Sequence, residues 1–249
     1  MILINTPTCF RAFLFAILVM YTPALVAQQG AQLYQKGDSL LKFNLLDSAE
    51  LYYKHASNQF QSEGNKVRYF DAQMQLLDII NSQGRYTDLI TKTKSIISEL
   101  EDSEHGLPVH FARTYRKKGA IEEFYNGDMN KALNLYKKAL TYNGTDTIQR
   151  PHIVFPELLK DCGVIYSYMN MGDSSRIHLK RAMAIISKFY QENKPEQADL
   201  KSLFAMTYYN EFKPKLALQE MRKAMEVFSG VEITTKAEYI QSNQYGNMS

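Results

Sequence analysis

The chain has 249 residues, of which 45% are apolar and 22% are charged, and its formal net charge is +3. This composition is typical of a folded protein and argues against a disordered one. Lys and Arg alternate with Asp and Glu along most segments, so no basic stripe is dense enough to neutralise a row of phosphates, and we expect no nucleic-acid partner.

The N-terminal residues have the features of a secretory signal peptide. Arg11 precedes an apolar run over residues 12–20, and the small residue Ala27 directly precedes the polar Gln28. We therefore expect residues 1–27 to be a signal peptide and residues 28–249 to be exported to the periplasm. An uncleaved anchor is the alternative, although the run is shorter than the ~20 residues that span a bilayer. Membrane contact is expected only through such an anchor or through a segment downstream of this chain.

A ladder of small and large residues then recurs five times, and its copies begin 40 to 43 residues apart. The copies are Gly37, Leu40, Ala49, Tyr53, Ala56; Leu77, Ile80, Leu89, Thr93, Ile96; Ala120, Glu123, Ala132, Tyr136, Ala139; Gly163, Tyr166, Ser175, Leu179, Ala182; and Ala205, Tyr208, Ala217, Met221, Ala224. Apolar residues at intervals of three and four predict two amphipathic helices in each copy. Asn44, Gly84 and Gly127 are expected in the turns between these helices. One such hairpin cannot bury its apolar face alone, so the copies must stack.

The segments 127–140 and 162–166 resemble the tetratricopeptide repeat (TPR) family, and the resemblance extends over about residues 31–249. The period exceeds the usual ~34 residues and is similar to that of kinesin light chains and of exported arrays in bacterial signalling proteins. The resemblance implies an all-α fold, a right-handed α-solenoid of about five stacked hairpins with one extra helix over residues 233–245. The second copy lacks the small residues and Glu123 replaces a large apolar one, so these two hairpins should pack less regularly.

The sequence contains no candidate catalytic motif. The histidines show none of the close pairings on a helix that bind zinc, and no phosphate-binding Gly-rich loop occurs, so we expect no metal, no cofactor and no enzyme activity. Glu122 and Glu123 are expected on an exposed surface with ordinary carboxyl pKa values. Once Cys9 is removed with the signal, Cys162 is expected to be a small buried residue; the alternative is a nucleophile with a base such as His178.

The resemblance also implies that the first helix of each hairpin lines a concave groove that holds a protein or peptide. The residues expected on the free side of these helices are Tyr34, Asp38, Met74, Asp78, Asn81, Lys117, Ile121, Tyr125, Lys160, Val164, Tyr168, Ser202, Met206 and Tyr209. A surface of Tyr and Met with isolated charges suits an extended peptide or a partner helix. Alternatively, some of these tyrosines pack between hairpins.

Three functions fit this organisation. The first is a stand-alone scaffold for protein–protein interaction. The second is the extracytoplasmic input region of a signalling protein, such as a histidine kinase or a transcription regulator, and the third is the repeat portion of a longer peptidase. The segment over residues 233–245 lacks a capping helix after it, so we expect the chain to be a fragment, and the coding sequence downstream of Ser249 would distinguish the three.

Overall fold

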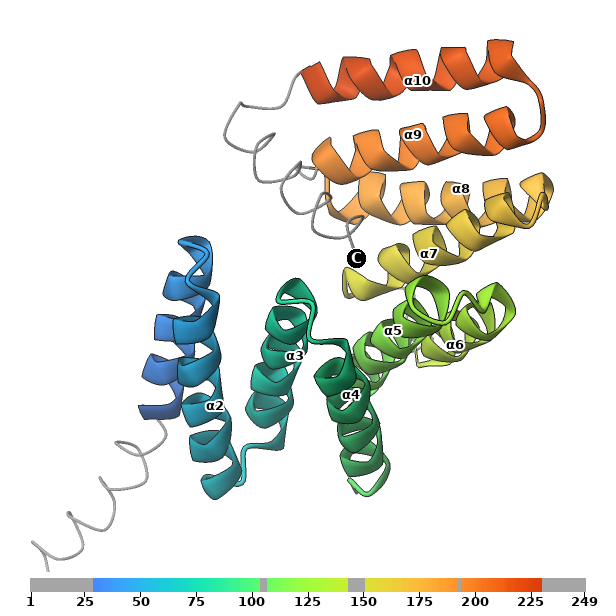
Figure 1. Ribbon diagram of the computed structural model, residues 1–249. Coiled ribbons are helices and arrows are strands. Elements are labelled where there is room, and N and C mark those ends of the chain that lie inside the picture. Colours follow the sequence, from blue (N-terminus) through green and yellow to red (C-terminus); the bar gives the residue numbers. More distant parts are fainter. Residues whose placement is uncertain (1–28, 104–106, 143–150, 192–193, 230–249) are drawn as a thin grey trace, which may run out of the picture. The chain divides into compact units, whose positions relative to one another are not determined.

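The computed structural model describes residues 29–103, 107–142, 151–191 and 194–229, and all regular secondary structure in these ranges is helical (Figure 1). A first helix spans residues 29–42. It is followed by α2 (Leu46–Ser62), α3 (Lys66–Ser82), α4 (Tyr86–Glu101), α5 (Pro108–Phe124), α6 (Met129–Thr141), α7 (Val154–Tyr168), α8 (Gly172–Phe189), α9 (Lys194–Asn210) and α10 (Pro214–Ser229). The expectation of an all-α fold is confirmed. The expected signal peptide, residues 1–27, and the expected extra helix, residues 233–245, lie outside the described residues.

The helices divide into two compact units, one ending at Arg85 and the other beginning at Tyr86. In the first unit, Tyr34 and Leu40 of the first helix pack with Tyr53 of α2, and α2 packs against α3. In the second unit, α5 pairs with α6, α7 with α8 and α9 with α10 (Figure 1). The first helices of these pairs also contact each other in order, α5 with α7 and α7 with α9. The second unit is therefore a stack of helical hairpins.

Connections between consecutive helices use a residue in the left-handed backbone region. The expected turn residues Asn44, Gly84 and Gly127 have φ values of 56°, 67° and 66°, which confirms their assignment. Gly tolerates this region without cost and Asn does so at little cost. Phe212 lies in the same region with φ of 59°, which is uncommon for a bulky side chain.

Small residues allow the two helices of a hairpin to approach. An ideal Cβ on Gly37 would lie 2.9 Å from the ring of Tyr53, and one on Gly163 would lie 2.8 Å from Leu179. Each glycine therefore marks a close contact between the two helices, as the ladder predicts.

In the third hairpin the predicted register is wrong by one residue. Gly119, and not Ala120, faces Tyr136, since its Cβ would lie 2.4 Å from that ring. The physical reason is the connection between α5 and α6, residues 125–128, which has one residue more than connections such as residues 43–45.

The second helices complete the core of the second unit. Ala139 of α6 packs with Phe155 and Leu158 of α7, and Ala182 and Ile186 of α8 pack with Leu200 of α9. Each layer thus covers the apolar face of the layer before it. In the described part of the chain, none of the helices combines the length and hydropathy that a bilayer span requires.

The prediction that Glu123 lies on an exposed surface is wrong. Its side chain is 8% exposed, and its Oε2 atom accepts a hydrogen bond of 2.7 Å from the Tyr136 hydroxyl. Glu123 lies near the C-terminal end of α5 on the side that faces α6. Its contact with Tyr136 of α6 therefore places it inside the hairpin. Burial raises the pKa of this carboxyl to about 7, with a smaller raising effect from Asp161, while Tyr136 and Arg116 lower it.

Candidate partner-binding face of the first helices

Three of the expected groove residues in the first unit have structural roles. The ring of Tyr34 packs edge-on against that of Tyr53 with centroids 5.1 Å apart, and Asp38 accepts a 2.6 Å hydrogen bond from the Tyr53 hydroxyl. Met74 is only 2% exposed. Asp78 and Asn81 are half-buried on α3. The first unit therefore presents few of the predicted side chains to a ligand.

The groove residues expected on α5 also lie mostly within the fold. Ile121 is buried, so its assignment to an exposed groove is wrong, as is that of Met74. Both assignments rest on helical spacing, which identifies a face of the helix but not what covers it. The ring of Tyr125 is half-buried against Tyr86, with centroids 4.1 Å apart, and Lys117 is half-buried.

On α7 and α9 the expected residues form a more open surface. Val164 and Met206 are half-buried, while Tyr168 is 54% exposed and Tyr209 is 70% exposed. The two helices pack against each other, so these side chains come from neighbouring first helices. We call the surface formed by these four residues the α7–α9 face.

Ion pairs between successive first helices fix the spacing of this part of the fold. Arg116 of α5 contacts Glu157 and Asp161 of α7, each at 2.6 Å, through Nη1 and Nε respectively. Although burial opposes the charge of Arg116, the two carboxylates raise its pKa above the ordinary value. A half-buried guanidinium between two carboxylates keeps its charge and orientation.

The next step of the stack repeats this arrangement. Lys160 of α7 contacts Glu196 and Asp199 of α9 at 2.8 Å and 2.9 Å. Burial opposes the charge of Lys160, but Asp199 and Glu196 raise its pKa. The prediction that Lys160 faces a ligand is therefore wrong, since the structure places it between two helices. Arg116 and Lys160 each lie three residues before a glycine that contacts the second helix of its hairpin, Gly119 and Gly163 respectively. With the correct register in the third hairpin, this shared position would have indicated from the sequence that the two cations have the same role.

The α7–α9 face continues into a pocket of about 570 Å³ at the turn end of these helices. It is lined by Tyr168, Asn170, Tyr209, Asn210, Phe212 and Pro214. Asn210 Nδ2 donates to the backbone oxygen and to the hydroxyl of Ser167, at 3.3 Å and 3.0 Å. These bonds join α9 to α7 near the C-terminal ends of both helices. We call this site the turn pocket.

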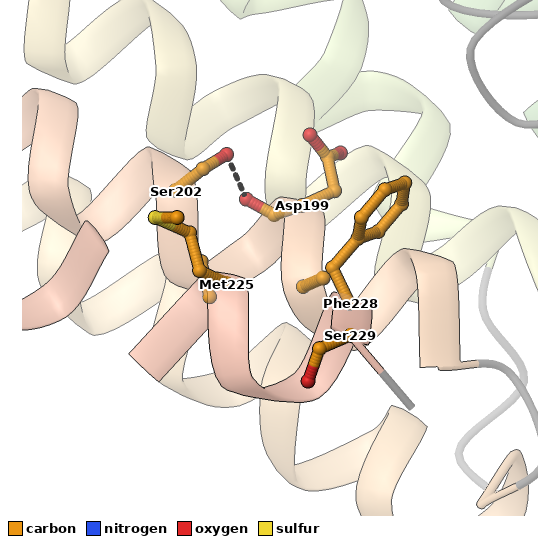
Figure 2. Close-up of a pocket in the computed structure, with 7 residues that line it drawn as sticks. Asp199, Ser202, Met225, Phe228 and Ser229 are labelled. Atoms are coloured by element: carbon orange, nitrogen blue, oxygen red, sulfur yellow. Dashed lines mark hydrogen bonds between the residues drawn. The ribbon is translucent and has the colours of Figure 1, made fainter. Parts of the chain in front are cut away.

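A second pocket, of about 350 Å³, lies between α9 and α10 (Figure 2). Asp199, Ser202, Met225 and Phe228 line it together with smaller residues, and the Ser202 hydroxyl donates to the backbone oxygen of Asp199. Ser202, expected in the groove, thus lies beside α10.

The nucleophile alternative for Cys162 finds no support. Its side chain is fully buried, and burial raises the pKa of the thiol to about 12. The prediction of a small buried residue is confirmed. His178 makes a 2.8 Å hydrogen bond with the backbone oxygen of Ser174 and packs against Tyr166. Among the described residues, no group of three or more His, Cys, Asp or Glu side chains is arranged to hold a metal ion.

No protein-family model matches the chain, and a comparison with curated protein sequences gives no match either. Solved structures do match it. BtubC (BKLC) from P. vanneervenii has a TM-score of 0.68 at 15% identity, with 87% of each chain covered. The apo form of the quorum sensor NprR from B. thuringiensis has a TM-score of 0.57 at 11% identity, covering 80% of this chain and 65% of that one.

A third similar structure is a putative kinesin light chain from Podosopora anserina with nearly identical TPR-like repeats. It has a TM-score of 0.57 at 11% identity, covering 83% of this chain and 96% of that one. At such low identities these likenesses show the fold alone. The fold is that of the TPR-like helical-repeat proteins.

Proposed function

We propose that this chain is an exported, non-enzymatic scaffold for protein–protein interaction, and that it binds a polypeptide on the α7–α9 face. The observation that carries the proposal is the pair of exposed tyrosines, Tyr168 and Tyr209, on adjacent first helices. Tyr is enriched at the centres of protein interfaces, because its ring gives contact area at low entropic cost and its hydroxyl accepts and donates hydrogen bonds.

The ion pairs and the Asn210 bonds support the proposal because they hold this face in one geometry. Lys160 bridges α7 to α9 through two carboxylates, and Asn210 fixes the turn end of α9 to Ser167. A binding surface whose spacing is set before the partner arrives loses less entropy on binding. The TPR-like fold shared with the similar structures is consistent with a role in holding other proteins.

The two alternative functions use the same face. An input region of a signalling protein and the repeat portion of a peptidase would both bind a partner there, and they differ in the domain encoded downstream of Ser249. Reading the gene beyond Ser249 distinguishes them from a stand-alone scaffold.

Site-specific photo-cross-linking tests the proposal. A photo-reactive phenylalanine analogue replaces Met206 on the α7–α9 face, and a matched one replaces Ile177, an exposed residue of α8. We expect a partner protein to cross-link from position 206 and not from position 177. Yield should fall when Tyr168→Ala and Tyr209→Ala are added, with an unchanged melting temperature, because both rings are more than half exposed. Equal yield from position 177, or undiminished yield in the double variant, would contradict the proposal.

A further inference from the structure

Phe212 combines two features that do not favour folding. Its backbone is left-handed, with φ of 59°, a region that suits Gly and Asn but crowds a bulky side chain. Its ring is 92% exposed, so its apolar surface gains almost nothing from burial. The same turn position holds Asn44 and Asn170 in two other hairpins. A strained, exposed aromatic residue at such a position indicates a role outside folding.

The surroundings of Phe212 form a site of defined chemistry. Phe212 lines the turn pocket together with two tyrosines, Tyr168 and Tyr209, and with Asn170, Asn210 and Pro214. All six lining residues are uncharged. Neither tyrosine hydroxyl makes a hydrogen bond to another residue in the described part of the chain. The pocket therefore offers aromatic faces and hydrogen-bond donors to a neutral ligand.

We propose that the turn pocket binds a proline-rich segment of the partner in the polyproline II conformation. This inference rests on the proposed function and specifies its ligand. Proline carries no N–H, so such a segment presents carbonyl acceptors and flat apolar rings. Tyr hydroxyls and the Asn170 amide donate to those acceptors, and aromatic rings receive the proline rings. The segment is already extended before it binds, which lowers its entropic cost. A charged ligand would find no opposite charge in this lining.

Isothermal titration calorimetry of the mature chain with a capped deca-proline peptide tests the inference, with a capped Gly-Ser decapeptide as the control ligand. We expect saturable binding of deca-proline and none of the Gly-Ser peptide. Phe212→Asn should weaken binding at least tenfold while the melting temperature stays the same or rises, because Asn relieves the strained backbone. Phe43→Ala is the matched control, since Phe43 is an exposed turn residue of the first unit; it should leave the affinity unchanged.

Three outcomes overturn the inference. The first is absence of deca-proline binding, the second is equal binding of both peptides, and the third is an affinity that Phe212→Asn leaves intact. A partner that still cross-links from position 206 without any deca-proline binding keeps the scaffold function and rejects only this ligand. If neither cross-linking from position 206 nor deca-proline binding is observed, both the scaffold function and the proline-rich ligand are rejected.

Discussion

The carboxyl group of Glu123 and the hydroxyl of Tyr136 form a buried polar pair between α5 and α6. Burial of Glu123 disfavours its charged form and raises its pKa to about 7, from an ordinary value of 4.5. The folded state thus binds this proton more tightly than the unfolded state does. The contribution of Glu123 is fully present below pH 4.5 and is lost as the pH rises through 7.

The variant Glu123→Gln tests this pair at the residue scale. Gln keeps an oxygen that accepts from the Tyr136 hydroxyl and carries no charge, so at pH 8 we expect it to stabilise the fold by roughly 1–3 kcal/mol. Near pH 4.5 the gain should largely vanish, because Glu123 is then protonated. Urea unfolding followed by circular dichroism at both pH values measures the difference. Glu122→Gln is the control, and a gain of equal size at the two pH values would argue against a titrating Glu123.

At the scale of the helices, Lys160 links α7 to α9 through Glu196 and Asp199. Its side chain is 17% exposed. Lys160→Met leaves two carboxylates close together without their cation, so we expect a loss of about 2–4 kcal/mol in the free energy of unfolding. The control is Lys131→Met: the Lys131 side chain is 62% exposed and lies 3.4 Å from Glu122, so this ion pair is worth roughly 0–1 kcal/mol. Similar losses in both variants, measured by urea unfolding, would show that the buried ion pair has no special role.

The register of the third hairpin gives a second test at this scale. Gly119→Ala places a methyl group against the ring of Tyr136, and we expect a net loss of about 1–2 kcal/mol, because overpacking outweighs the better helix propensity of Ala. Ala120→Gly, at the half-buried neighbour, should cost only about 1 kcal/mol of helix propensity. Thermal unfolding of the two variants compares them. A stabilised Gly119→Ala would mean that the ring of Tyr136 moves aside.

The helices and most of their turns could be predicted from the sequence, because apolar spacing and residues such as Gly84 and Gly127 determine them locally. The register of the third hairpin could not, since one additional residue in a connection leaves the apolar pattern of each helix unchanged. The candidate face was predicted in part. Helical spacing identified Tyr168 and Tyr209, but it also selected Ile121, which neighbouring helices cover. Phe212 was missed because its backbone conformation is a property of the folded turn.

For the whole molecule, the proposed location depends on the N-terminal sequence. We expect the secretory machinery to cleave the chain after Ala27, since this small residue follows an apolar run and precedes polar residues. N-terminal sequencing of protein recovered from the periplasm should therefore begin at Gln28. A chain that begins at Met1 and stays in the cytoplasm would reject this location, and it would leave the binding face to be tested independently.

Removal of residues 1–27 would leave Cys162 as the single thiol of the chain. Because Cys162 is fully buried in α7 and burial raises its pKa to about 12, a thiol reagent reacts with it only in molecules whose α7 has opened. The rate at which the reagent modifies Cys162 therefore measures how often the second unit opens, without any added probe. A ligand that contacts both α7 and α9 should lower this modification rate as its occupancy rises. The native cysteine then reports binding at a face that it does not touch.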